Sequence, residues 1–264
     1  MDQRNQAAVA NAAPGPWVAM GRGMVLARLD WDITMHRVVM VLLGQLDAQE
    51  TSHFCLQRVR ARRIRDIAQV TQKSIHQEVA RAAEKLDEAT IGVWKPENRE
   101  HERVPVFVRC VYKSRRGILE ARFADALRAH VGGDETHGGR YPLRYGMRLS
   151  TPYAIRAYEI SKMIASAEGE DEKRLPISLF RRVLKLEDKY RRHCDMRRRV
   201  IAPAISEVSE KTDVRVQCSD VREGQTPVAL KWRVERKDGE ERTKISKGRK
   251  RETVEGGEPR PSLS

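Results

Sequence analysis

Residues 195–217, DMRRRVIAPAISEVSEKTDVRVQ, change from a helical to an extended pattern within one short stretch. In the first part the apolar residues share one arc of a helical wheel: Val200, Ile201, Ala204, Ile205 and Val208. This predicts a helix from about Asp195 to Lys211 with that arc toward the core, and Pro203 inside it favours a kink. From Val214 onward apolar and polar residues alternate, so a strand is expected directly after the helix.

The residues on either side of this stretch complete a small domain. Residues 228–234 alternate as residues 214–218 do, which predicts a hairpin with one buried face and one basic face. Upstream, residues 153–165 have a helical pattern, and after the short stretch 174–178 a second helix is expected with Ser178 as its cap. Two helices, a turn near Glu187, a third helix and a hairpin are the order of a winged helix-turn-helix domain.

The first half of the chain has the same order. Helices are expected at residues 33–46, 60–69 and 73–89, and Thr71 can cap the third. Strands are expected at residues 54–59, 90–94, 104–112 and 117–123, joined in part by a polar loop at 95–103 and a turn at 113–117. The predicted fold class is therefore α+β, with two tandem winged helix-turn-helix domains and disordered terminal arms.

Composition sets the expected ends of these domains. Residues 1–28 are rich in Ala, Gly, Asn and Gln and contain two prolines, which predicts a flexible arm. The N-terminal winged helix is expected at 29–146 and the C-terminal one at 147–236. Residues 237–264 have almost no apolar side chains, so we expect a disordered basic tail. Its KGRKR cluster either solvates the tail or contacts phosphates nonspecifically.

The overall charge points to a polyanion. The 264 residues include 51 Lys and Arg against 37 Asp and Glu, a formal net charge of +14, and the mean hydropathy is −0.63. The longest apolar run, Val38 to Leu43, is far short of the roughly 20 residues of a membrane span. The first residues, MDQRNQAAVA, lack a signal-peptide pattern. We therefore expect a soluble cytoplasmic protein with no membrane partner, and nucleic acid is the commonest polyanion.

Signatures of catalysis are missing from the sequence. The cysteines at 55, 110, 194 and 218 have no CxxC spacing, so reduced and mostly packed thiols are expected. There is no phosphate-loop motif, and the seven histidines show no metal-ligand spacing. No carboxylate pair stands in a context for acid and base chemistry. We expect a binding protein with no catalytic residues, no metal and no cofactor, rather than an enzyme.

The positive charge is concentrated in two blocks. Residues 189–199, KYRRHCDMRRR, hold six basic residues and one acid, a net charge of +5 at the head of the last predicted helix. The helix head and the basic face of the hairpin give the predicted DNA-binding residues Lys189, Arg191, Arg192, Arg197, Arg198, Arg199, Lys231 and Arg233. The alternative is a solvated face, or arginines paired with Glu207 and Glu210. The second block, residues 58–73, could contact phosphates or be simply exposed.

At these motifs the chain resembles the initiator replication proteins of iteron-bearing plasmids, which are built from two winged helices. The resemblance is clearest in STPYAIRAYEISK (150–162), in residues 179–217 and in the hairpin ending VALKWRVERK (228–237). It is looser in SIHQEVARAAEKLDEATI (74–91) and RGILEARFADAL (116–127), and together these parts span about residues 25–236.

The resemblance implies a protein that recognises repeated double-stranded DNA sites at an origin. The role of the last helix in reading iterons carries over onto Arg197, Arg198 and Arg199, with Arg191 and Arg192 nearby. It further implies a first domain for dimerisation and backbone contacts, a homodimer in equilibrium with the monomer, repression of its own gene by the dimer, and recruitment of the host initiator and replicative helicase. The alternatives are a winged-helix transcription regulator without a replication role and, third, a DNA-processing enzyme.

Overall fold

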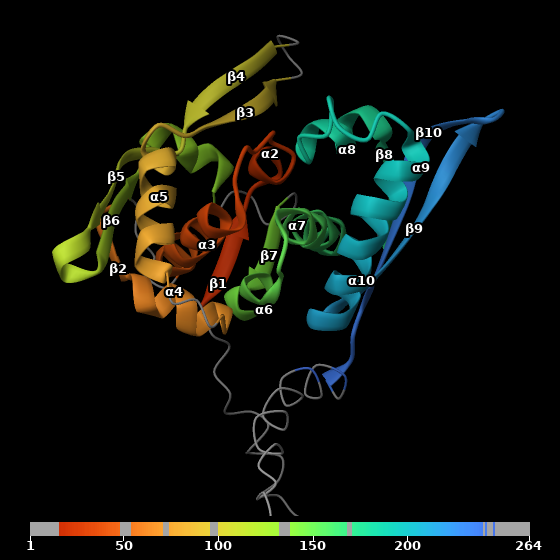
Figure 1. Ribbon diagram of the computed structural model, residues 1–264. Helices are drawn as coiled ribbons and strands as arrows, with labels where there is room; N and C mark the ends of the chain where they lie inside the picture. The colour runs from red at the N-terminus through yellow and green to blue at the C-terminus, as the bar shows by residue number, and fades with distance from the viewer. Residues whose placement is uncertain are drawn as a thin grey trace, which may run out of the picture.

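The computed structural model describes residues 16–47, 54–70, 74–95, 100–131, 138–167, 171–239, 241 and 245, and the chain forms two lobes on either side of one central helix, α7 (Figure 1). The first lobe begins with β1 (Trp17–Met20), α2 (Arg22–Val25), α3 (Ile33–Asp47), β2 (Gln57–Arg60), α4 (Ala61–Ala68) and α5 (Ile75–Asp87). It continues with β3 (Thr90–Lys95), β4 (Glu100–Pro105), β5 (Phe107–Lys113), η1 (Ser114–Arg116), β6 (Ile118–Phe123), η2 (Asp125–His130), β7 (Gly139–Pro142) and α6 (Leu143–Arg148).

The second lobe begins with α7 and contains the predicted helix and hairpin. Its elements are α7 (Pro152–Ser166), β8 (Glu172–Pro176), α8 (Ile177–Val183), α9 (His193–Met196), the π turn η3 (Arg197–Ile201), α10 (Ala202–Lys211), β9 (Val214–Glu223) and β10 (Thr226–Arg236). Strands β9 and β10 form a long antiparallel hairpin, and β8 pairs with the other edge of β10. We call this β9–β10 hairpin the wing.

Four small antiparallel sheets frame the core in the described part of the chain. Their strand orders are β1-β7, β2-β6-β5, β3-β4 and β8-β10-β9. The apolar arc of the last helix packs as predicted, because Val200, Ile201, Ala204 and Val208 are buried and Ile205 is half-buried. On the wing, Leu230, Trp232 and Val234 face inward and Arg233 faces outward, which confirms the two-faced hairpin.

The prediction of a flexible arm over residues 1–28 is wrong for its last part. Residues 17–20 form β1, which pairs with β7, and Val18, Met24 and Val25 are fully buried. Residues 1–15 lie outside the described residues. Glycines and prolines produce a loop-like composition here, but the apolar side chains between them still fill the core beside α3.

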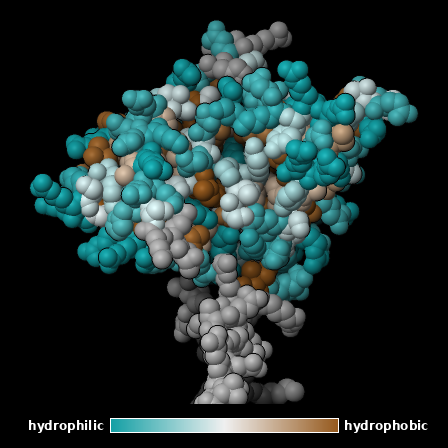
Figure 2. All heavy atoms as spheres, in the orientation of Figure 1, coloured by the Kyte–Doolittle hydropathy of each residue, from teal (hydrophilic) through white to brown (hydrophobic). Residues whose placement is uncertain are grey.

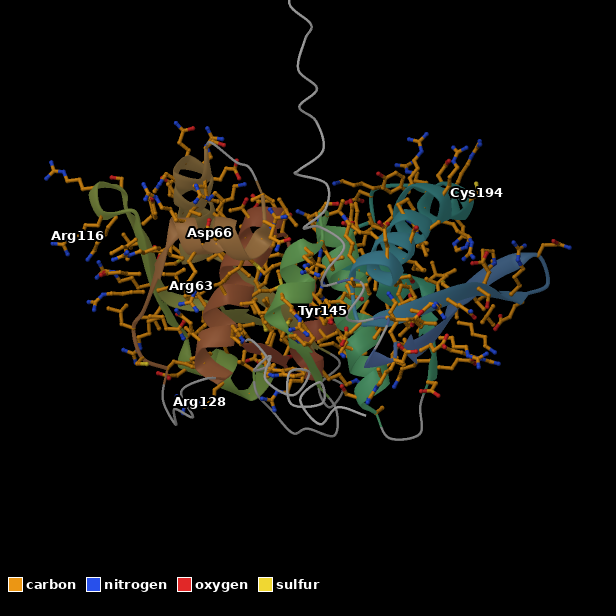
Figure 3. All side chains as sticks on the ribbon, turned by 90° about the horizontal axis from the view of Figure 1, so that it is seen from below. Arg63, Asp66, Arg116, Arg128, Tyr145 and Cys194 are labelled. Carbon is orange, nitrogen blue, oxygen red and sulfur yellow. The ribbon has the colours of Figure 1, made fainter. Side chains whose placement is uncertain are left out.

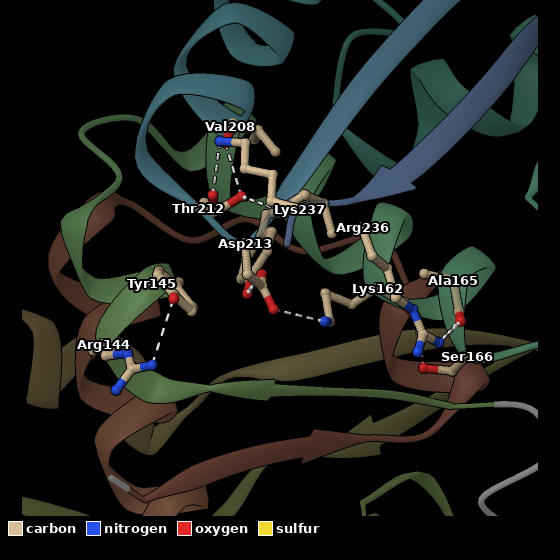
Figure 4. Close-up of polar contacts among 12 residues, drawn as sticks. Arg144, Tyr145, Lys162, Ala165, Ser166, Val208, Thr212, Asp213, Arg236 and Lys237 are labelled. Carbon is tan, nitrogen blue, oxygen red and sulfur yellow. Dashed lines mark hydrogen bonds and ion pairs between the residues drawn. The ribbon is translucent and has the colours of Figure 1, made fainter. Parts of the chain in front are cut away.

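The first residue of the predicted tail is also part of the folded structure. Lys237, placed at the start of a disordered tail, is buried, and its Nζ donates hydrogen bonds to the main-chain oxygens of Ser209 and Thr212. These carbonyls end α10, where a helix has unpaired acceptors and a negative dipole end, so the ammonium group caps it (Figure 4). Burial lowers the pKa of this lysine. The KGRKR cluster lies outside the described residues.

Smaller corrections concern caps and strand ends. Ser178 does not cap α8, because the helix starts at Ile177 after Pro176. The predicted strand 104–112 divides at Val106, and residues 100–103 of the predicted loop belong to β4, which pairs with β3. Of the strand expected at 54–59, only residues 57–59 are in β2, which extends one residue further to Arg60. Thr71, the predicted cap of α5, lies outside the described residues, and the helix follows Ser74.

A buried ion pair ties the first lobe to α7. Arg156 and Glu159 are within 2.5 Å of each other and almost fully buried. The same guanidinium donates from Nη2 to the main-chain oxygens of Val25 and Ala27, and the Tyr141 hydroxyl donates to Glu159. Burial raises the pKa of Glu159, against the opposing effect of Arg156. We call these residues, together with the neighbouring His36, the Arg156 cluster.

His36 makes the fold sensitive to acid. Its ring is buried edge-on against Trp31, and burial, together with the positive charge of Arg156, lowers its pKa from 6.5 to about 3. In the unfolded chain His36 therefore becomes protonated near pH 6.5, whereas in the folded chain it stays neutral until about pH 3. Stability is retained above pH 6.5 and falls progressively as the pH drops through this window.

We predict that replacing His36 by Gln flattens this acid response. Between pH 6.5 and pH 5 the native protein should lose about 2 kcal/mol more of its free energy of unfolding than His36→Gln loses. Urea unfolding at a series of pH values measures the difference. Parallel curves for the two proteins would contradict the assignment.

Candidate nucleic-acid interface

Helices α9 and α10 are joined without a gap by a π turn at Arg197–Ile201, so that the three form one helical run. This turn precedes Pro203, whose ring would clash with the carbonyl of Arg199 in a regular α-helix and which has no N–H to donate. A wider turn removes that conflict, so the predicted irregularity takes the form of a π bulge. Arg198 and Arg199 are both residues of this bulge.

Arg198 and Arg199 are exposed side chains at this bulge. The Arg198 side chain is 73% exposed, and within the described residues its polar contact is with Asp195, three residues earlier, at 3.3 Å. Arg199 is exposed and has no polar partner in the parts of the chain that the structure describes. The alternative that these arginines pair with Glu207 is wrong, because Glu207 instead accepts from Lys211 and from the amide of Ser150.

The loop before α9 is held by Arg181 of α8, a residue whose role the sequence patterns did not reveal. Arg181 donates hydrogen bonds to the main-chain oxygens of residues 186, 189, 190 and 191. Lys185 and Tyr190 adopt left-handed backbone conformations in this loop. One guanidinium with five donors can satisfy several carbonyls that no strand or helix pairs. The loop therefore presents the exposed Lys189, Arg191 and Arg192.

Arg197 points in another direction from its two neighbours. Its Nη1 donates to Asp220 at 3.0 Å and its Nη2 to the main-chain oxygen of Cys218 at 2.8 Å, both on β9. On a helical wheel Arg197 falls on the apolar side of the helix, and the wing covers that side. Among the predicted DNA-binding residues, Arg197 thus connects the helix to the wing. Burial raises the pKa of the neighbouring Cys218 thiol, partly opposed by Arg197.

The two predicted residues of the wing lie on its outer face in different surroundings. Lys231 forms an ion pair with Glu172 of β8 at 2.9 Å. Arg233 is exposed and has no polar partner within the described residues. Both alternate with the buried Trp232, whose Nε1 donates to Ser161 of α7. The basic face that the sequence predicts exists, but part of its charge is neutralised.

The second basic block, residues 58–73, lies on the first lobe, and most of its described residues belong to β2 and α4. Arg60, Arg62 and Arg63 are exposed around Asp66, which pairs with Arg65 at 2.8 Å. Arg58 and Lys113 flank Glu120, and their hydrogen bonds, that of Lys113 first, lower the pKa of this carboxyl. Gln69 ends α4 in the left-handed conformation, the role that glycine has in many such turns.

Both basic blocks are found on one side of the molecule. In Figure 3, Asp66 of α4 and the exposed Cys194, the second residue of α9, lie toward the same side of the molecule. That side faces the viewer in Figure 1, and Figure 2 shows its surface as largely hydrophilic with small separate hydrophobic spots. A long polyanion could therefore contact both lobes at once.

The described part of the chain meets neither the requirements of a metal site nor those of a membrane helix. No group of three His, Cys, Asp or Glu side chains there could hold a metal ion. None of its helices combines the length and the apolar character needed to cross a membrane.

Family models match both lobes of this chain. The model described as "Initiator Replication protein, WH1" matches residues 17–162, and "Initiator Rep protein, WH2" matches residues 176–233. The first range includes β1 and α2, in agreement with the folded position of residues 17–28, and it extends past the predicted boundary at 146 into α7.

One solved structure shares this fold at low sequence identity, and a second gives a much weaker match. The crystal structure of Pi initiator protein in complex with iteron DNA matches with a TM-score of 0.71 and 16% identity, over 86% of this chain and all of the other. A structure of domains 2 and 3 of RctB matches with a TM-score of 0.39 and 10% identity, over 77% of this chain and 80% of the other. The first match confirms the two-lobed winged-helix fold.

We predict that Arg197 and Arg199 differ in their effect on stability. Arg197→Ala removes two hydrogen bonds to the wing and should cost about 1 kcal/mol, since the side chain is partly exposed. Arg199→Ala should stay within about 0.5 kcal/mol of the native protein. Thermal unfolding of both variants measures this, and equal losses would contradict the assigned roles.

Proposed function

Because the chain belongs to the initiator replication protein family, we propose that it binds iterons, the repeated sites of a plasmid origin, and initiates replication there. Reading of the repeats is assigned to the second lobe, residues 147–236. The Pi initiator protein was crystallised in complex with iteron DNA, and the shared fold makes the same ligand the first one to test here.

One observation carries the proposal: exposed arginines gather at a helix head that is bound to a wing, and a further one lies on the outer face of that wing. Arg191, Arg192, Arg198 and Arg199 are exposed at the head of the α9–α10 run, and Arg233 is exposed on the wing. Guanidinium groups donate in pairs to guanine edges in the major groove and also bind phosphates. A helix head in the major groove with a wing beside it is how winged helix-turn-helix proteins meet DNA.

The first lobe is proposed to add backbone contacts and dimerisation. Its exposed Arg60, Arg62 and Arg63 surround Asp66, which lies toward the same side as Cys194 of the second lobe (Figure 3), and this supports phosphate contacts at one end of a site. The structure contains one chain, and the proposed monomer–dimer equilibrium, repression of its own gene by the dimer and recruitment of the host initiator and replicative helicase rest on family membership.

Footprinting on the DNA beside the gene tests the proposal. Protection of several direct repeats is expected, since each repeat should engage both basic blocks. A single protected palindrome would favour a transcription regulator instead. A steep salt dependence with no protected repeat would mark purely nonspecific phosphate binding. Strand cleavage dependent on added metal would favour a DNA-processing enzyme.

Substitution of the two exposed arginines at the bulge tests the reading role. Arg198→Ala and Arg199→Ala should each cost about 1–3 kcal/mol of binding free energy on the protected repeat and relax its sequence preference. Binding titrations on the repeat and on a scrambled duplex measure both effects. An equal loss on the two duplexes would assign these residues to phosphates.

A further inference from the structure

A single carboxylate joins the basic helix head to the wing. The Asp220 side chain on β9 is only 15% exposed, and its Oδ1 accepts from Arg197 at 3.0 Å. Nε2 of His193 lies 3.0 Å from the same oxygen, although without hydrogen-bond geometry, and Arg222 lies 3.9 Å from the other oxygen. Three cationic or protonatable groups, two from the α9–η3 helical run and one from β9, therefore surround one acid.

The contact through Arg197 fixes the helix in two places. Arg197 reaches Asp220 with one nitrogen and the Cys218 carbonyl with the other, two residues apart on the same strand. It is also the first residue of the π turn, directly before Arg198 and Arg199. Any tilt of the helix head against the wing would break one of these bonds.

The charge of Asp220 opposes DNA binding on its own. It lies within a basic surface, where a carboxylate repels phosphates and withdraws Arg197 from them. If Asp220 acted only through its charge, removing that charge would strengthen binding to DNA of every sequence. The geometry assigns it a different effect, because a rigid helix head presents its exposed arginines to one arrangement of base edges.

We propose that Asp220 is a positioning residue that sets the sequence specificity of DNA binding. It holds Arg197 on the wing and thereby fixes the direction of Arg198 and Arg199. The inference rests on the proposed function, since it assumes that these arginines read DNA. It adds an acidic residue of the wing to the determinants of recognition.

Asp220→Asn tests the proposal against a matched control. Glu223→Gln removes the same charge from the same strand, and Glu223 is exposed and has no polar partner in the described residues. Asp220→Asn should bind the protected repeat about tenfold more weakly, the change expected for about 1.4 kcal/mol of coupling. Its affinity for a scrambled duplex should stay constant or rise. Glu223→Gln should change both affinities by the same small factor.

A double-mutant cycle locates the effect in the Arg197 contact. Combining Arg197→Gln with Asp220→Asn should reduce the ratio of repeat to scrambled affinity no further than Asp220→Asn alone. Asp220→Glu, which keeps the charge, should recover part of the ratio. If Asp220→Asn shifts both duplexes equally, as Glu223→Gln does, Asp220 acts only as a charge and the proposal is overturned.

Hydrogen exchange of the free protein separates this inference from the proposed function. Amides of residues 193–201 should exchange faster in Asp220→Asn and at the native rate in Glu223→Gln, while the rest of the core stays protected. A native protein that prefers no repeat would contradict the proposed function. Unchanged exchange in Asp220→Asn would overturn the positioning role whatever DNA the protein prefers.

Discussion

The buried contact between Arg156 and Glu159 is the constraint on which the arrangement of the two lobes depends. A charged pair inside a protein is costly unless every donor and acceptor finds a partner. Here most of the partners come from three separate parts of the chain: the carbonyls of Val25 and Ala27, the hydroxyl of Tyr141 and helix α7 itself. Nε of Arg156 is buried without a hydrogen-bond partner among the described residues. The segment around α2 must therefore fold against α7, although its composition resembles that of a loop.

Helix α7 also forms polar contacts with the rest of the second lobe, so its position fixes that lobe as well. Two residues after Arg156, Tyr158 donates to Asp213 at 2.7 Å, and Lys162 pairs with the same carboxylate at 3.0 Å (Figure 4). Ser161 accepts from Trp232 in the wing. A single buried helix thus contacts the first lobe through one set of polar groups and the junction of α10 with β9 through another. The spacing of the two basic blocks follows from these contacts, because each block is attached to an element that packs on α7 or its neighbours.

Periodicity predicted much of this fold, and the failures occurred where partners come from distant residues. The helices at α3, α5, α7 and α10 and the wing follow from apolar patterns that need no knowledge of the rest of the chain. The folded part of the predicted arm could not be recognised from such a pattern, because the burial of Val18 and Met24 depends on β7 and α7. Arg197 was grouped with its neighbours by sequence, since a helical wheel says nothing of an acid on a strand more than twenty residues later. Arg181 gave no signal, because its acceptors are main-chain oxygens of a loop.

Different basic residues of the last helical run have different roles: some hold the helix in position, and others remain exposed. At its head, Arg197 is bound to the wing, while at its end the buried Lys237 caps the final carbonyls. These two cations orient the helix and are thereby withdrawn from a ligand. Arg198 and Arg199, between them, have exposed side chains without a bond to the wing in the described residues. A flexible guanidinium on a rigid base loses only side-chain entropy when it binds, whereas a flexible helix would also lose backbone entropy. Specific recognition therefore requires that some basic residues hold the helix in place so that others can bind DNA.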